Sequence, residues 1–221
     1  MHSSVMITSD LLNQVGLPSV LEACHCRTPQ GSRLKNTVRF YGTASRIDLE
    51  QELNAVSQLA DLIRKKHPQL VEALTQLARL RELRGTFSRI EKGGLLDDTE
   101  FFELKGALAI FSRLKKLSFV LDAADVTFED TNNAASLLDP GAKNNPAFHI
   151  YNEYSATLAE IRNRKKELER QISQTRGPQR NTLLTQRALV VAEEDQEEEK
   201  IRRDLGAKLS AWLPQMRHNA E

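Results

Sequence analysis

Basic side chains that could bind phosphate groups are concentrated in the last third of this 221-residue sequence. Between positions 162 and 187 only two carboxylates, Glu167 and Glu169, accompany the cations. The cations are Arg162, Arg164, Lys165, Lys166, Arg170, Arg176, Arg180 and Arg187. Such a run can neutralise a nucleic-acid backbone. It is more commonly a solvated helix surface, and both interpretations stay open at this point.

Other chemistry is hard to assemble from the sequence. Cys24-His25-Cys26 could be half of a metal site, but no second Cys/His cluster would complete four ligands. The five histidines are scattered and lack obvious carboxylate partners, and Gly141-Ala142-Lys143 lacks the upstream glycine of a phosphate-binding loop. We therefore expect no catalytic residue, no cofactor-binding residue and no metal site, and we expect that the chain is not an enzyme.

Composition predicts the elements that must carry these side chains. The aromatic content is only 5% and the charged content is 28%. A sequence rich in Leu, Ala, Glu, Arg and Lys favours helices, because sheets recruit β-branched and aromatic residues. The net charge of +1 gives no whole-molecule attraction to nucleic acid. With two cysteines and no transmembrane or signal segment evident, we expect a cytoplasmic protein with no membrane partner.

Hydrophobic periodicity predicts a helical body. Apolar residues recur every three or four positions from about Ser45 to Lys66, which indicates an amphipathic helix. Pro68 opens a second apolar stripe that continues to Leu83. Asp97-Asp98-Thr99 caps a third helix, whose apolar residues extend to Leu121. Three helices of this size can bury a core together.

The last third predicts a different arrangement. From Ala156 to Thr175 the apolar residues thin to a narrow coiled-coil seam, with Lys165 at one of its apolar positions. Gly177-Pro178 breaks the helix, and a second helix is expected from about Gln179 to Trp212. Within it, positions 193–199 are polar on every side, which indicates a helix surrounded by water.

The sequence thus predicts an all-α fold, in which a helical core bundle carries a long projecting antiparallel helical hairpin. Residues 1–140 form the expected core, 141–154 a connecting loop with a short extended segment, and 155–221 the lever-like hairpin. The polar, charged end of the sequence fits a segment of a longer protein.

The order of several short motifs resembles the MutS-type DNA mismatch repair family. Leu137-Leu138-Asp139-Pro140 precedes a loop, followed by an aromatic stretch at Phe148-His149-Ile150-Tyr151 and by Tyr154-Ser155. Leu158 and Arg162 then open a Leu- and Arg-rich helix, as in the family's segment between helical core and lever. Further likenesses are Phe102-Glu103-Leu104-Lys105 and the acidic run 193–199 followed by Ile201-Arg202. The resemblance covers most of the chain, more securely after Leu95.

The resemblance implies a core-and-lever segment that couples DNA contact to an ATPase domain. That domain, with its ATP and Mg²⁺, lies outside this chain, as does the family's mismatch-reading domain, and the 174–181 tip is short for a clamp. We expect no cofactor in the chain itself, weak binding of double-stranded DNA, and a homodimer in a full-length form. The expected DNA contacts are Arg176, Arg180 and Arg187 at the hairpin tip. The alternative is a stand-alone helical adaptor whose coiled-coil arm binds a protein partner.

Overall fold

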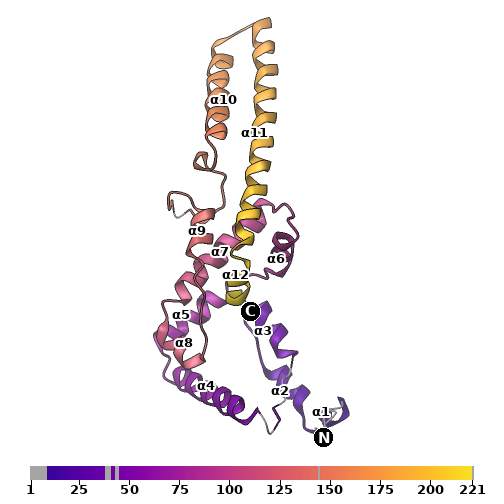
Figure 1. The fold of residues 1–221 in the computed structure, drawn as a ribbon, viewed down its shortest axis with the longest axis vertical. Helices are drawn as coiled ribbons and strands as arrows, with labels where there is room; N and C mark the ends of the chain where they lie inside the picture. Colours follow the sequence, from indigo (N-terminus) through magenta and orange to yellow (C-terminus); the bar gives the residue numbers. More distant parts are fainter. Residues whose placement is uncertain (1–8, 38–40, 43–44, 144, 221) are drawn as a thin grey trace. The chain divides into compact units, whose positions relative to one another are not determined.

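The computed structural model describes residues 9–37, 41–42, 45–143 and 145–220 and confirms the expected all-α fold (Figure 1). The described residues form helices joined by turns and loops, without a β-strand. Residues 1–8, 38–40 and 43–44 of the expected core, Asn144 of the expected loop and Glu221 lie outside the described residues. No helix in the described ranges combines the length and apolar content that a bilayer crossing requires.

The helices group into two compact units that interleave along the sequence. The described residues of Met1–Glu82 and Arg113–Thr127 belong to the first unit, and Leu83–Ser112 and Phe128–Ala220 belong to the second. The division into segments 1–140, 141–154 and 155–221 stays a prediction.

The first unit contains six helices among its described residues. They are α1 (Ser9–Gln14), α2 (Leu17–Ala23), α3 (Pro29–Lys35), α4 (Arg46–Arg64), α5 (Pro68–Leu77) and α8 (Ser118–Ala124). Both α4 and α5 pack against α8, and Leu62, Leu70 and Val120 are buried there. The His67 ring stacks on Phe119 with ring centroids 4.7 Å apart.

The second unit contains α6 (Arg84–Glu91), most of α7 (Asp98–Leu114) and α9 (Asn132–Leu138). It continues through the short helix η2 (Asn152–Tyr154) to α10 (Ala156–Gln174), α11 (Pro178–Ser210) and α12 (Leu213–Ala220). Its largest fully buried side chains include Phe101, Phe111, Leu138, Leu158, Leu209 and Met216. Phe101 stacks on Phe148 at 4.5 Å, so the loop after α9 is attached to α7.

Two of the predicted caps are confirmed. Asp97 and Glu100 form a reciprocal capping box at the start of α7, because each side chain accepts from the backbone N–H of the other at 2.8 and 3.1 Å. Ser155 caps α10 by accepting from the N–H of Leu158 at 3.3 Å. These contacts satisfy N–H groups that have no partner inside the helix.

Two predicted helices are interrupted in the structure. The stripe from Pro68 to Leu83 ends as a helix at Leu77, and the stripe up to Leu121 breaks after Leu114, before α8 begins at Ser118. Leu80, Leu83 and Leu117 lie at these breaks and are buried at 1–7% exposure. The chain turns there to place these leucines in a core, so the apolar spacing continues although the helix does not.

The carboxyl-terminal helices are tied to the rest of the second unit by polar contacts. Arg202 of α11 donates to Asp98 at 2.9 Å. The side chain of Asn219 in α12 accepts from the N–H of Glu129 at 2.7 Å and donates to its carbonyl at 3.1 Å. Because Asn219 is buried, both halves of its amide replace water with a backbone partner.

Candidate nucleic-acid interface

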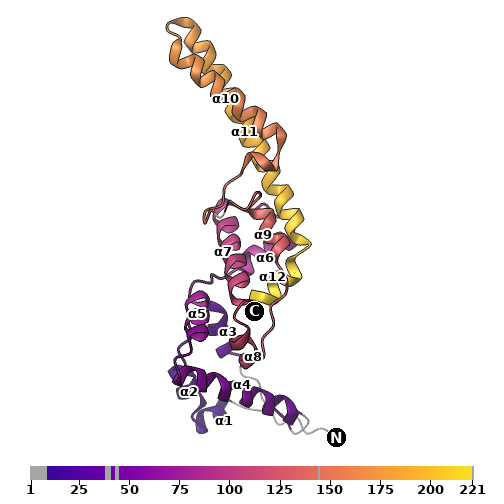
Figure 2. The ribbon, with the colours of Figure 1, turned by 90° about the vertical axis from the view of Figure 1, so that its left-hand side faces the viewer.

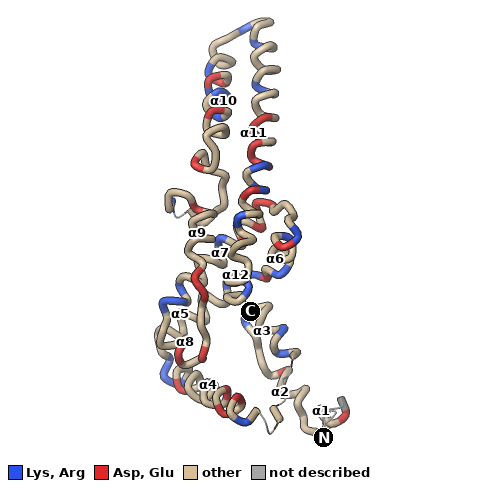
Figure 3. The backbone as a smooth tube through the Cα atoms, in the orientation of Figure 1, with Lys and Arg blue, Asp and Glu red and all other residues tan. Residues whose placement is uncertain are grey.

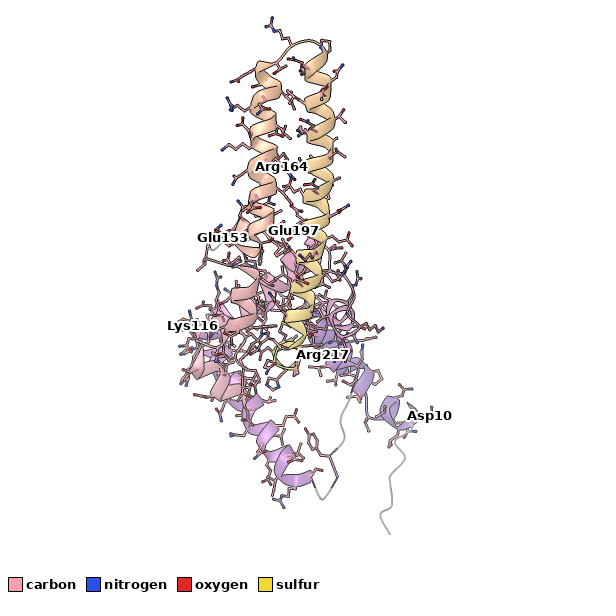
Figure 4. All side chains as sticks on the ribbon, turned by 45° about the horizontal axis from the view of Figure 1, so that its top comes forward. Asp10, Lys116, Glu153, Arg164, Glu197 and Arg217 are labelled. Atoms are coloured by element: carbon pink, nitrogen blue, oxygen red, sulfur yellow. The ribbon has the colours of Figure 1, made fainter. Side chains whose placement is uncertain are left out.

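Helices α10 and α11 lie side by side in both views of the fold (Figures 1 and 2). Their ion pairs show the direction of each helix. Glu169 of α10 pairs with Arg187, Arg164 with Glu193, and Arg162 with Glu198. Because the numbers fall on α10 as they rise on α11, the two helices are antiparallel. Arg164 and Glu197 mark the two facing helices in Figure 4.

A charged residue occupies the centre of the seam between these helices. Glu194 is only 7% exposed, and its carboxylate accepts from Lys165 and, at 2.9 Å, from Arg162. The expectation that 193–199 is polar and wet on every side is therefore wrong at Glu194. Lys165 supplies the reason, because the polar residue in the apolar seam of α10 meets its charge partner across the interface.

The ionisation of Glu194 follows from this environment. Burial alone opposes the charged carboxylate and raises its pKa. The hydrogen bonds from Lys165 and Arg162, with their charges, outweigh that effect and place the pKa of Glu194 below its ordinary value. Glu194 is therefore ionised at neutral pH and acts as a fixed anion between two cations.

Arg162 also fixes the base of the helix pair. Its guanidinium donates to Glu198 of α11 at 2.8 Å, to the carbonyl of Ile150 at 2.9 Å and to Asn152 at 2.8 Å. Since Ile150 and Asn152 precede α10, one side chain joins the incoming chain to both helices. Such a charge-assisted network restricts how α10 can rotate against α11.

The turn between the helices depends on glycine. Gly177 has φ 80° and ψ −158°, a conformation that is open essentially to glycine alone. Pro178 follows at the first helical position of α11, where its missing N–H leaves no helical bond unmade. The chain therefore turns from α10 into α11 at Gly177-Pro178, with Arg176 on one side and Arg180 on the other.

The three predicted DNA-contacting arginines differ in their surroundings. Arg176 and Arg180 are exposed, and neither side chain forms an ion pair or hydrogen bond with any described residue. Arg187 instead donates to Glu169 at 2.8 and 2.9 Å. Arg187 thus stabilises the helix pair. The guanidinium N–H groups of Arg176 and Arg180 donate to no described residue.

Charge is segregated along the helix pair. From position 171 to 192 there is no carboxylate, and the charged residues are Arg176, Arg180 and Arg187. The acidic residues of α11 lie further from the turn, where they pair with cations of α10 (Figure 3). Lys166 is one more exposed cation without an ion pair among the described residues.

The Cys24-His25-Cys26 motif lies between α2 and α3. Cys24 and Cys26 are exposed and unbonded. The described residues contain no group of three or more His, Cys, Asp or Glu side chains placed to hold a metal ion.

Comparison of the chain with protein-family models and with curated proteins gave no match.

Proposed function

We propose that this chain is the non-catalytic core and lever segment of a MutS-like protein of DNA mismatch repair or a related DNA transaction. In this proposal the α10–α11 pair is a projecting arm whose turn touches the phosphate backbone of double-stranded DNA in the cytoplasm. ATP and Mg²⁺ are bound by a domain outside the chain, so the chain alone neither binds nor hydrolyses ATP. A longer form that includes the ATPase domain is proposed to act as a homodimer.

The observation that carries the DNA role is the pair of unpartnered arginines at the turn. Arg176 and Arg180 lie on either side of Gly177-Pro178 without a carboxylate to neutralise them. A guanidinium offers five N–H donors in a planar fork that matches phosphate oxygens. Because the neighbouring residues 171–192 contain no acid, an approaching polyanion meets no repulsion there.

The structure of the arm supports a coupling role in this proposal. The buried Lys165–Glu194 contact sets the register of the two helices. Helix α11 runs from the turn to buried Leu205 and Leu209 without interruption. A force applied at the turn is therefore transmitted along one helix to its packing partners α6 and α9.

A salt titration of duplex DNA binding tests the proposal. A few phosphate contacts support only non-specific affinity, with Kd on the order of 10⁻⁴–10⁻⁶ M, that weakens steeply with salt. The variant Arg176→Glu/Arg180→Glu should bind more weakly at low salt. It should also flatten the slope of log K against log salt by about two units, because two fewer counterions are released.

A matched variant separates this effect from total charge. Lys115 and Lys116 are exposed and form no ion pair with any described residue, so Lys115→Glu/Lys116→Glu changes the net charge equally. The proposal requires this control to bind DNA with nearly the native salt slope. Equal slopes for the native chain and the arginine variant would remove DNA from the function of the arm.

That negative result would favour a helical adaptor that binds a protein partner. One observation supports this second function. Leu184 and Leu189, on the half of α11 nearest the turn, are 41% and 63% exposed. Single exposed leucines are common on soluble proteins, so the DNA role is preferred. Binding of a partner protein that survives Arg176→Glu/Arg180→Glu and fails with Leu184→Asp/Leu189→Asp would establish the adaptor.

A further inference from the structure

Helix α4 exposes an apolar stripe that no described part of the chain covers. Leu53, Val56 and Ile63 are 59%, 59% and 61% exposed. Leu49 and Ala60, which lie on the same line, are partly exposed. The opposite side of α4 packs against α8, with Leu62 buried at 7%. Two different faces of the helix are thus apolar, and one of them packs on α8 while no described residue covers the other.

The spacing of the exposed stripe is that of a coiled coil. Its members follow one another at intervals of four, three, four and three residues, at positions 49, 53, 56, 60 and 63. A repeat of this kind keeps one narrow seam facing a second helix along its whole length. The seam runs from position 49 to 63 of the 19-residue helix α4, so it extends for about 21 Å at 1.5 Å per residue.

The charged residues that flank this seam are acidic near the start of α4 and basic near its end. Glu50 and Glu52 flank the seam near the start of α4, while Arg64 and, just past the helix end, Lys66 flank it at the other. In heptad terms Glu50 and Arg64 lie on one flank of the seam and Glu52 lies on the other, while Lys66 follows the helix end with φ 50°. Flanking charges that are acidic near one end and basic near the other are complementary to those of a second copy in the reverse direction.

We propose that two copies of this chain associate through α4 as an antiparallel coiled coil. The twofold axis crosses the seam near residue 58, so that Leu53 of one copy packs with Ile63 of the other and Val56 packs with Ala60. In this register Glu50 faces Arg64, and Glu52 lies toward Lys66 just past the end of the other helix, twice each by symmetry. Parallel pairing is disfavoured, because it brings the two acidic ends together and the two basic ends together. The association is independent of the arginines proposed to contact DNA.

The ion pairs that these side chains form within α4 can be replaced by ion pairs between two copies. Glu50 accepts from Arg46 at 2.7 Å and Arg64 donates to Asp61 at 2.5 Å, both within α4 and exposed. Exposed pairs of this type contribute little stability, so their partners can be replaced across an interface. A seam of about 21 Å buries less surface than stable dimer interfaces do, so the expected Kd is in the micromolar range.

Sedimentation equilibrium of the full 221-residue chain tests the seam. The native chain should dimerise between about 1 and 100 μM. Leu53→Lys places a charge inside the seam and should raise Kd at least about tenfold. Ile47→Lys is the matched control, because Ile47 is a 71% exposed apolar residue of the same helix that lies outside the stripe. Its Kd should stay within about twofold of the native value. Circular dichroism checks that both variants fold.

Charge reversal tests the direction of the two helices. Glu50→Lys/Glu52→Lys places cations opposite Arg64 and Lys66 of the second copy and should abolish dimers. Adding Arg64→Glu and Lys66→Glu to the same chain should restore them. A parallel pair would give no such loss and rescue, so intact dimers in the first variant would overturn the antiparallel arrangement. A native chain that stays monomeric at 100 μM, or equal effects of Leu53→Lys and Ile47→Lys, would overturn the interface itself.

Discussion

The guanidinium Nε of Arg162 on α10 lies 2.9 Å from the carboxylate of Glu194, a buried residue of α11. Lys165 holds the second oxygen of the same carboxylate. A charge buried between two helices is tolerated only when its partners meet it in one register. The Glu194 contacts therefore fix the register of α10 against α11, because a shift of one helix along the other would leave Glu194 buried without a partner.

Replacing Glu194 with alanine should destabilise the α10–α11 pair by about 1–3 kcal/mol, because two cations lose their buried partner. The exposed Glu199, which pairs only with Arg203 one turn later in the helix, is the matched control. Glu199→Ala should cost less than about 0.5 kcal/mol. Urea unfolding followed by circular dichroism measures both. A double-mutant cycle with Lys165→Ala should return a coupling energy well above that of the Glu199–Arg203 pair.

Stability of the helix pair should fall in acid, and the sign follows from the lowered pKa of Glu194. A carboxyl whose pKa is lower in the folded state stabilises the fold at pH values above its unfolded pKa, near the ordinary 4.5. That contribution is lost as the pH falls through the folded pKa. The free energy of unfolding, measured from pH 7 down to pH 2 for the native chain and Glu194→Gln, should converge in acid. Parallel curves would show that Glu194 does not carry the effect.

Substituting Leu168 with aspartate should separate the helix pair while the first unit stays folded. Leu168 is a half-buried member of the α10 seam, and the nearest cations before it, Arg164 and Lys165, are already paired with Glu193 and Glu194, so a carboxylate there would be poorly compensated. Hydrogen exchange should become faster along α10 and along the half of α11 nearest the turn. Protection around Leu70 and Val120, in the first unit, should not change. Lys166→Asp, at an exposed position of the same helix, is the control and should leave exchange near native.

The turn should not tolerate a side chain at position 177. Gly177→Ala meets no atom within 4 Å of its new Cβ, so its cost is conformational and not steric. The backbone conformation at this residue should cost an alanine about 1–3 kcal/mol. Gly85, in α6 and also without a neighbour, has no such backbone constraint, and Gly85→Ala should stabilise by about 0.5–1 kcal/mol. Thermal unfolding should therefore show shifts of opposite sign.

Helical periodicity and local cap signals made much of this fold predictable from sequence. The expected helices near 45–66, 156–175 and 179–212 correspond to α4, α10 and α11 within a few residues. Apolar spacing, the Ser155 cap and the Gly177-Pro178 break depend on residues within one or two helical turns. Their effect therefore does not depend on how the helices pack. The breaks after Leu77 and Leu114 carry no glycine or proline, so only the tertiary demand to bury Leu80 and Leu117 explains them.

The burial of Glu194 was missed for a different reason. A local run of acids indicates a solvated surface, but Glu194 lies four residues after Val190 and seven before Ile201, in step with the seam. That spacing, together with Lys165 at an apolar position of the α10 seam, is the feature of the sequence that predicts the burial of Glu194. The partners of Arg187 could not be predicted in the same way, because its pairing with Glu169 depends on the relative register of two helices.

The unbroken course of α11 has a mechanical consequence. From buried Leu205 to Pro178 the helix behaves as a stiff rod about 40 Å long, at 1.5 Å of rise per residue. Tilting such a rod by about 5° around its lower end carries its upper end sideways by roughly 3.5 Å, close to the width of an atomic contact. A shift at Leu205 too small to disturb core packing is thus magnified into a displacement large enough to make or break a hydrogen bond beside Arg180.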